Sequence, residues 1–236
     1  MADTLKTRNG NRILAALPSV EYELVVPHLD KVSLRHGQIL QVPDQRIEFL
    51  YFPTTCMISL LAALEGGETV ETGVVGGEGM VGISVVLGVE TSPNEALVQA
   101  DGEAYRMKAK ALGPLIKNGS VLHDNLLRYI HAIFAQISQT AACNRAHSLS
   151  ERLARWLLLT HDRLGRDEFE LTHEFLARML GTRRAGVSVA ASTLREAGAI
   201  GYTRGRVTIL DREGLENAAC ECYRIVKAEF DRLSKS

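Results

Sequence analysis

Residues 171–200 read LTHEFLARMLGTRRAGVSVAASTLREAGAI and determine how the second half of the chain is expected to fold. Thr172 is a good N-cap, and Glu174 in the first turn favours the helix dipole, so a short helix is predicted to begin here. Gly181 then supplies a residue that can turn with positive φ. A second helix is predicted to run through Arg195, with a buried face formed by Val187, Ala190, Ala191 and Leu194. A short helix, a tight glycine turn and a second helix are typical of a helix-turn-helix.

The segment that follows, IGYTRGRVTIL in residues 200–210, predicts a β-hairpin with arginines at its turn. Residues 171–206 hold six arginines against two glutamates, a local charge of +4 on a chain whose formal net charge is −1. Such a local surplus can bind phosphates even when the whole chain is neutral.

These features predict a DNA-binding surface. Arg184 lies near the start of the second helix, where an arginine can read a guanine in the major groove. The hairpin would lie against the phosphate backbone as a wing. The predicted DNA-binding residues are Thr172, Arg183, Arg184, Ser188, Ser192, Arg204 and Arg206. The alternative is an ordinary helical hairpin with solvated arginines.

The first 110 residues contain short runs of Val, Ile, Leu and aromatic residues, separated by Gly, Pro, Asn and Asp. Many short strands with Gly-rich turns favour a sandwich or barrel. The expected strand segments are residues 32–42, 47–53, 55–64, 68–75 and 94–109. A short helix is expected before them, near residues 11–17.

Residues 120–146 predict one long helix, because apolar residues recur at gaps of three and four. The expected stripe is Leu122, Leu126, Leu127, Ile130, Ile133, Phe134, Ile137 and Ala141. The helix either joins two copies of the chain or lies on its own barrel. A break is expected at residues 145–150, where Ser148 or Ser150 can cap the next helix.

The composition excludes several classes of protein. The 236 residues are 46% hydrophobic and 23% charged, which is typical of a soluble globular chain. No apolar run approaches the ~18 residues of a membrane span, and the polar start lacks a signal-peptide core, so a cytoplasmic location is expected. No P-loop, HExxH or GxSxG motif is present, so no enzyme activity is expected.

No metal site is expected from the cysteines. The first 55 residues hold none, and no CxxC pair is present. Cys220 and Cys222 are predicted to lie on one helix, about 200° apart, where they could not share a metal or form a disulfide. We interpret both as packing residues. Nothing in the sequence calls for a haem, and no cofactor is identified.

The helix-turn-helix, the LREAGAI segment and the Arg-Gly hairpin resemble the C-terminal domain of the cyclic AMP receptor protein/Fnr (Crp/Fnr) superfamily of bacterial transcription regulators. The resemblance implies an α+β chain with three parts. Residues 1–111 would form a β-roll, a jelly roll like that of cyclic-nucleotide-binding domains. Residues 112–147 would form the dimerisation helix and hinge, and residues 148–236 the winged helix-turn-helix DNA-binding domain.

The resemblance also implies site residues. Arg184 matches the guanine-reading arginine of the family, whereas Ala185 and Val189 replace two other base-contacting residues, so a different operator is expected. Gly77 and Glu78 match the Gly-Glu turn of the cyclic-nucleotide pocket. Asn94 and Glu95 fall where the family has the Arg-Ser pair that holds the phosphate.

The predicted sensor pocket, formed by Gly77, Glu78, Asn94 and Glu95, is therefore degenerate. A carboxylate replaces a cation beside the phosphate, and like charges held close in a partly buried site cost on the order of a few kcal/mol. Cyclic AMP is not expected to bind well, and the effector is unknown.

The expected function is a homodimeric, sequence-specific transcription regulator that binds double-stranded DNA. RNA polymerase is a candidate further partner, and no membrane contact is expected. The alternative is a ligand-sensing or protein-interaction module whose winged helix contacts a protein partner instead of DNA.

Overall fold

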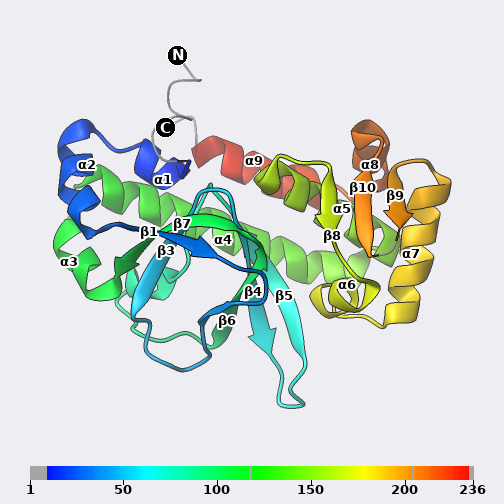
Figure 1. Ribbon diagram of the computed structural model, residues 1–236, viewed down its shortest axis with the longest axis horizontal. Helices are drawn as coiled ribbons and strands as arrows, with labels where there is room; N and C mark the ends of the chain where they lie inside the picture. The colour runs from blue at the N-terminus through cyan, green and yellow to red at the C-terminus, as the bar shows by residue number, and fades with distance from the viewer. Residues whose placement is uncertain (1–9, 117–118, 204, 234–236) are drawn as a thin grey trace.

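The computed structural model describes residues 10–116, 119–203 and 205–233 of the chain. An N-terminal pair of sheets is followed by a long helix and a helical domain with a small sheet (Figure 1). The helices are α1 (Arg12–Ala15), α2 (Ser19–Val25), α3 (Leu112–Leu115), α4 (Val121–Ala146), α5 (Leu149–Leu164), α6 (His173–Met179), α7 (Arg184–Glu196), α8 (Arg212–Ala218) and α9 (Cys222–Leu233), with short 3-10 turns η1 (Val26–His28), η2 (Ile83–Val85) and η3 (Ala109–Ala111). The strands are β1 (Asp30–Leu34), β2 (Ile39–Gln41), β3 (Phe49–Pro53), β4 (Met57–Ala63), β5 (Thr69–Val75), β6 (Asn94–Ala100), β7 (Gly102–Lys108), β8 (Glu168–Glu170), β9 (Ile200–Thr203) and β10 (Arg206–Ile209). The expected α+β fold, with its β-roll, long helix and winged helix-turn-helix, is confirmed.

The β-roll consists of two antiparallel sheets, with strand orders β1-β7-β3 and β2-β6-β4-β5. Their facing sides are filled by fully buried side chains such as Phe52, Ile58 and Val98. The strand segment expected at residues 94–109 supplies one strand to each sheet, β6 and β7. A Cβ on Gly102, where the chain changes sheets, would lie 2.5 Å from the backbone nitrogen of Cys56, so this corner requires glycine.

The long helix α4 begins where Ser120 caps it, with the Ser120 side chain accepting the His123 N–H. Its expected apolar stripe divides into two faces. One face is buried against the rest of the chain and consists of Leu122, Leu126, Tyr129, Ala132, Ile133, Gln136, Thr140 and Cys143. Leu127 and Phe134 point away from it and are 43% and 69% exposed. The single expected stripe is therefore wrong, because polar Gln136 and Thr140 belong to the buried face.

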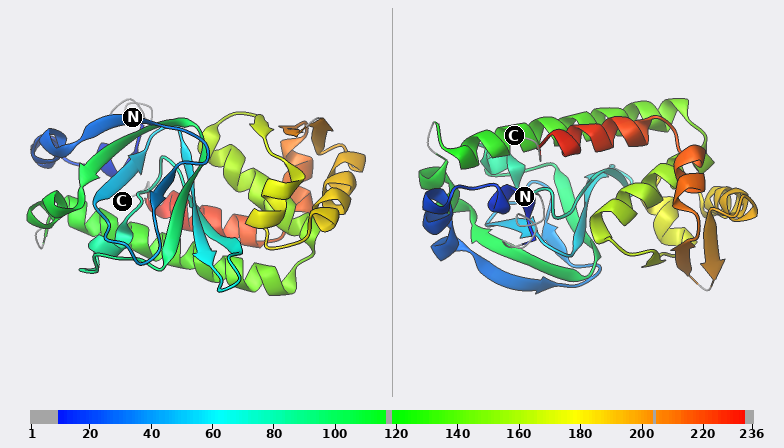
Figure 2. Two further views of the ribbon diagram at one scale, coloured as in Figure 1. Left: turned by 60° about the horizontal axis from the view of Figure 1, so that its bottom comes forward. Right: turned by 90° about the horizontal axis from the view of Figure 1, so that it is seen from above.

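The C-terminal domain follows α4 after a connection of two residues. Ser148 caps α5 with a full capping box, in which Glu151 bonds back to the Ser148 N–H, and Gly165 ends α5 with φ 62°. The last helix, α9, leaves this domain and runs back along α4, so the two helices lie side by side (Figure 2). No helix in the described ranges combines the length and apolar character that crossing a membrane would require.

Candidate functional site

The helix-turn-helix forms as its sequence predicts. The Thr172 side chain accepts the Phe175 N–H at 3.1 Å and starts α6. Gly181 turns the chain with φ 57°, and α7 then runs as far as Glu196. The predicted buried face of α7 is confirmed: Val187, Ala190, Ala191 and Leu194 are all buried. This face packs α7 against α5 and α6, and therefore fixes which side of α7 is exposed.

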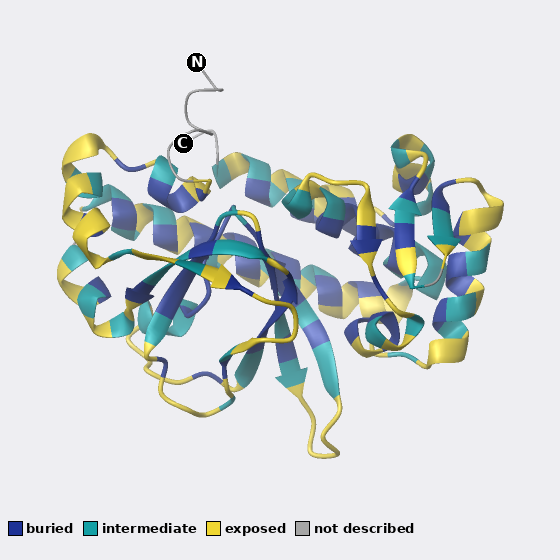
Figure 3. Ribbon diagram, viewed as in Figure 1, coloured by how far each residue is buried: buried dark blue, intermediate teal, exposed yellow. Residues whose placement is uncertain are grey.

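The exposed start of α7 carries two cations. Arg183 is the N-cap residue and Arg184 the first residue of the helix, and both side chains are exposed. Neither side chain makes an ion pair or hydrogen bond to another residue in the described ranges. Figure 3 shows the outer side of α7 as largely exposed, at one edge of the molecule. Two guanidinium groups thus meet solvent at the N-terminus of a helix, an arrangement suited to phosphate and guanine acceptors.

The predicted hydroxyl contacts are already engaged within the chain. Ser188 Oγ lies 2.9 Å from Nδ1 of His173 and donates to the Arg184 carbonyl at 3.1 Å. Ser192 donates to the Glu196 carboxylate at 2.9 Å. Burial, followed by the nearby Arg184 charge, lowers the pKa of His173, so this imidazole is neutral at neutral pH. The arginines are therefore the stronger donors of this surface.

The predicted hairpin is present as β9 and β10, and Gly205 has φ 78° at its turn. Arg204 lies outside the described residues. Arg206 is exposed but has ion pairs to Glu168 at 3.6 Å and Glu170 at 3.5 Å. Both glutamates belong to β8, a third strand that the sequence interpretation missed. Its signal was the alternation of Glu168, buried Phe169 and Glu170.

The predicted sensor-pocket residues do not bond to one another. Glu78, in the loop after β5, is buried and accepts a hydrogen bond from Arg163 Nε of α5 at 2.8 Å. Glu95, in β6, pairs with Arg178 of α6 at 3.4 Å. Among the described residues, no hydrogen bond or ion pair links Gly77 or Glu78 to Asn94 or Glu95. Each glutamate instead binds an arginine of the C-terminal domain. No local motif marks these partners, which lie more than 80 residues away in the sequence.

A third carboxylate also joins the two domains. Glu71 of β5 is buried and accepts hydrogen bonds from Ser59 Oγ and Trp156 Nε1, both at 2.7 Å. Trp156 belongs to α5, so the bond crosses from the β-roll to the C-terminal domain. Burial raises the pKa of Glu71 to about 7, and its two donors oppose the shift.

This raised pKa predicts a pH dependence of stability. Between pH 4.5 and about 7 the folded chain holds the Glu71 proton more tightly than the unfolded chain does. The free energy of unfolding should therefore fall as pH rises through this window, by on the order of 3 kcal/mol, and then level off. Urea titrations at pH 5 and pH 8 would measure the fall. The neutral variant Glu71→Gln should remove most of this fall. If the free energy of unfolding fell equally between pH 5 and pH 8 in the wild type and the variant, Glu71 would not be its source.

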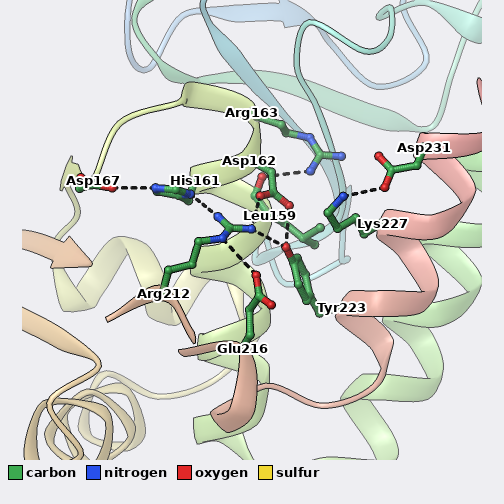
Figure 4. A network of polar contacts seen from close by, with 10 residues as sticks. All are labelled: Leu159, His161, Asp162, Arg163, Asp167, Arg212, Glu216, Tyr223, Lys227 and Asp231. Atoms are coloured by element: carbon green, nitrogen blue, oxygen red, sulfur yellow. Dashed lines mark hydrogen bonds and ion pairs between the residues drawn. The ribbon is translucent and has the colours of Figure 1, made fainter. Parts of the chain in front are cut away.

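A network around Arg212 fixes α8 and α9 on α5 (Figure 4). Arg212 donates to Asp162 and to the Tyr223 hydroxyl, each at 2.7 Å, and Tyr223 donates to Asp162 at 3.0 Å. His161 also contacts Arg212 and lies 2.7 Å from Asp167. These bonds set where the chain enters α9.

The cysteines are arranged differently from the sequence expectation. Cys220 lies before α9 and Cys222 is its first residue, so the prediction of one helix carrying both is wrong. The extended backbone that ends α8 at Ala219 breaks the helix between them. As a result both sulfurs face Cys143 and His147, at the end of α4, and the four potential ligand atoms lie within 4.8 Å of one another.

Comparisons with known proteins identify the fold. Residues 151–218 match the family model described as a Crp-like helix-turn-helix domain. No curated protein sequence matches the chain significantly. Among solved structures, a protein from Eubacterium rectale ATCC 33656, described as a regulator of the crp/fnr family, is similar with a TM-score of 0.70 at 18% identity, over 89% of this chain and 99% of that chain.

Two further structures are similar over most of their length. A CRP-family transcriptional regulator from Thermus thermophilus has a TM-score of 0.66 at 20% identity, over 80% of this chain and 96% of that chain. FixK2 from Bradyrhizobium japonicum has a TM-score of 0.65 at 16% identity, over 81% of this chain and 98% of that chain. The resemblance to the Crp/Fnr superfamily is confirmed in the helix-turn-helix domain by its family model, and over most of the chain the fold is similar to that of these solved structures.

Proposed function

We propose that this chain is a homodimeric, sequence-specific DNA-binding transcription regulator of the Crp/Fnr type, acting in the cytoplasm and without enzyme activity. The observation that carries the proposal is the pair of guanidinium groups, Arg183 and Arg184, that have no partner in the described ranges at the exposed start of α7, in a Crp-like helix-turn-helix. Arg184 would read a guanine, and Arg183 would contact the adjacent phosphate. Arg206 would join them on the wing after exchanging its Glu168 and Glu170 partners for DNA phosphates.

The exposed face of α4 supports dimerisation. Its apolar residues follow one another at alternating gaps of three and four, the spacing of a coiled-coil seam: exposed Leu127, Phe134 and Ala141, with half-buried Ile130 and Ile137 between them. Phe134 is 69% exposed in the single chain. The α4 helices of two copies could bury this seam together, which would place two α7 helices on one two-fold symmetric DNA site.

The signal would enter through contacts between the domains. Glu71, Glu78 and Glu95 of the β-roll each bind a donor in α5 or α6. A shift between two arrangements about residues 147–148 would break or form these contacts and reset the spacing of the α7 helices. Cyclic AMP is not proposed as the signal, since Arg163 occupies Glu78, and since Glu95, at the position of the family's phosphate ligands, is a carboxylate already paired with Arg178. Isothermal titration should give no saturable heat with cyclic AMP.

Arg184→Ala tests the proposed function. The preferred site is first selected from random duplex DNA, and fluorescence anisotropy then measures affinity. The variant should lose about 1–3 kcal/mol of binding free energy at that site and tolerate other bases at the guanine position. A matched control is Arg195→Ala, at the exposed far end of the same helix, which should change specificity little.

Salt dependence separates the DNA interpretation from a protein partner. Binding of the wild-type chain to nonspecific duplex should weaken steeply as salt rises, because phosphate contacts release counterions. A flat response, or Arg184→Ala binding as tightly and selectively as the wild type, would overturn the proposal and favour a winged helix that contacts a protein.

A further inference from the structure

Four side chains with metal-binding atoms meet at the junction of α4 and α9. Cys143 and His147 are one helical turn apart at the end of α4, whereas Cys220 lies two residues before α9 and Cys222 is the first residue of α9. The Sγ atoms of Cys143 and Cys220 are 3.5 Å apart, as are Cys222 Sγ and His147 Nδ1. All four atoms lie within 4.8 Å of one another. None of the four residues takes part in the proposed DNA contacts.

These distances fit a single tetrahedral ion. Bonds of about 2.3 Å from zinc to sulfur and about 2.05 Å to nitrogen place two sulfurs about 3.8 Å apart, and a sulfur and a nitrogen about 3.5 Å apart. A four-iron cluster binds each protein ligand to a different iron, and so needs its ligand atoms farther apart than this group holds them. Three sulfurs and one imidazole are also the ligand set of structural zinc sites.

The surrounding residues orient the ligands as in known zinc sites. His147 Nε2 lies 3.3 Å from the Glu221 carboxylate, so its proton is held there while Nδ1 faces the sulfurs. Gln139 Nε2 donates to Cys222 Sγ at 3.1 Å. A carboxylate on the outer nitrogen of a ligating histidine fixes its tautomer and strengthens it as a ligand.

Two arginines, Arg152 and Arg155, supply positive charge next to the proposed metal site. A zinc ion with three thiolates and an imidazole carries a net charge of −1. Arg155 is only 7% exposed, and its Nε and Nη1 have no hydrogen-bond partner among the described residues. Arg152 Nε is likewise buried and unpartnered there. Both guanidinium groups interact electrostatically with Cys143. A negative metal–thiolate centre would compensate the buried cation of Arg155 and the half-buried cation of Arg152.

We propose that Cys143, His147, Cys220 and Cys222 form a binding site for a thiophilic divalent ion, Zn²⁺, that joins the end of α4 to the start of α9. The bound ion would cross-link two helices that meet beside the 147–148 connection between the domains. The assignment does not rest on DNA binding, and its test involves no DNA.

The test uses the full chain purified from cells under reducing conditions. Elemental analysis should find one zinc per chain. After exchange, Co²⁺ should show sulfur-to-cobalt charge-transfer absorption and the intense visible bands of tetrahedral cobalt. Removing zinc with a chelator should lower the melting temperature, and adding zinc back should restore it.

Variants assign the signal to these residues. Cys222→Ser and His147→Ala should lose the stoichiometric metal, whereas Cys56→Ser should keep it. Cys56 is a matched control because it is buried in the β-roll, where its thiol bonds to the Glu103 carbonyl. Glu221→Gln changes an exposed side chain and leaves all four ligands in place. Because it removes the carboxylate that orients His147, it should weaken metal binding by about 10-fold. This variant keeps the test decisive if a ligand variant fails to fold.

Four results would each overturn the site. The wild-type chain could bind neither zinc nor cobalt, or could instead contain iron and sulfide. Alkylation and mass mapping could show a Cys143–Cys220 disulfide in the freshly purified chain, which would remove two ligands. Cys56→Ser could reduce the metal content as much as Cys222→Ser does.

Discussion

Replacing both Leu127 and Phe134 by aspartate is expected to split the proposed dimer and to weaken binding to a two-half-site duplex by about 100-fold or more. In the proposed dimer each subunit would contact one half-site, and dimerisation would make the second contact intramolecular, an advantage that a monomer would lose. In the dimer, each aspartate would lie beside its symmetry copy within an apolar seam, where desolvation and like-charge repulsion act together.

Sedimentation and light scattering would measure the mass of the variant, and anisotropy its affinity for DNA. The matched control is Val20→Asp on α2, which replaces another apolar side chain that is 74% exposed. This control should remain dimeric and bind DNA as the wild type does. A wild-type chain that is already monomeric, or a double variant that stays dimeric, would show that the exposed α4 face is not the interface.

Arg163→Ala is expected to destabilise the folded chain by about 3–5 kcal/mol, because it leaves the Glu78 carboxylate buried without its cation and with the Gly76 N–H as its remaining hydrogen-bond donor among the described residues. The side chains of Arg163 and Glu78 are 5% and 8% exposed, and Arg163 Nε lies 2.8 Å from Glu78 Oε1. The Arg163 guanidinium also lies over the Phe230 ring, 5.3 Å from its centroid, so the substitution removes a contact with α9 as well. Urea unfolding would measure the loss as a lower midpoint.

Two further variants distinguish the cost of leaving a buried charge unpaired from the cost of losing an ion pair at the surface. Arg46→Ala removes a pair with Glu90 that is exposed to solvent, and should cost less than about 1 kcal/mol. Adding Glu78→Gln to Arg163→Ala should recover much of the stability, since no charge is then buried alone. Equal losses in Arg46→Ala and Arg163→Ala, or no recovery in the double variant, would contradict this account.

Local signals predicted most of the elements. Thr172, Gly181 and Gly165 end or begin helices through interactions with backbone a few residues away, and the sequence therefore locates them without tertiary information. The buried face of α7 was predicted because helical periodicity depends on neighbouring positions alone. The short strand β8 was missed, since three residues give too little periodicity to stand out from a loop.

Long-range pairing explains what the sequence interpretation could not place. Periodicity identified the apolar positions of α4, but it could not separate the face that meets α9 from the face left exposed, as both faces contain leucines. The contact between Glu78 and Arg163 depends on how the β-roll packs on α5, and the contact between Cys143 and Cys220 depends on how the segment before α9 packs on α4.

The sequence by itself thus determined the order and type of most of the elements and the arginines at the start of α7, because caps, turns and helical repeats act over a few residues. The tertiary structure decided which arginine meets each sensor glutamate and whether the cysteines converge. These contacts join residues more than 70 positions apart, and no local propensity encodes them.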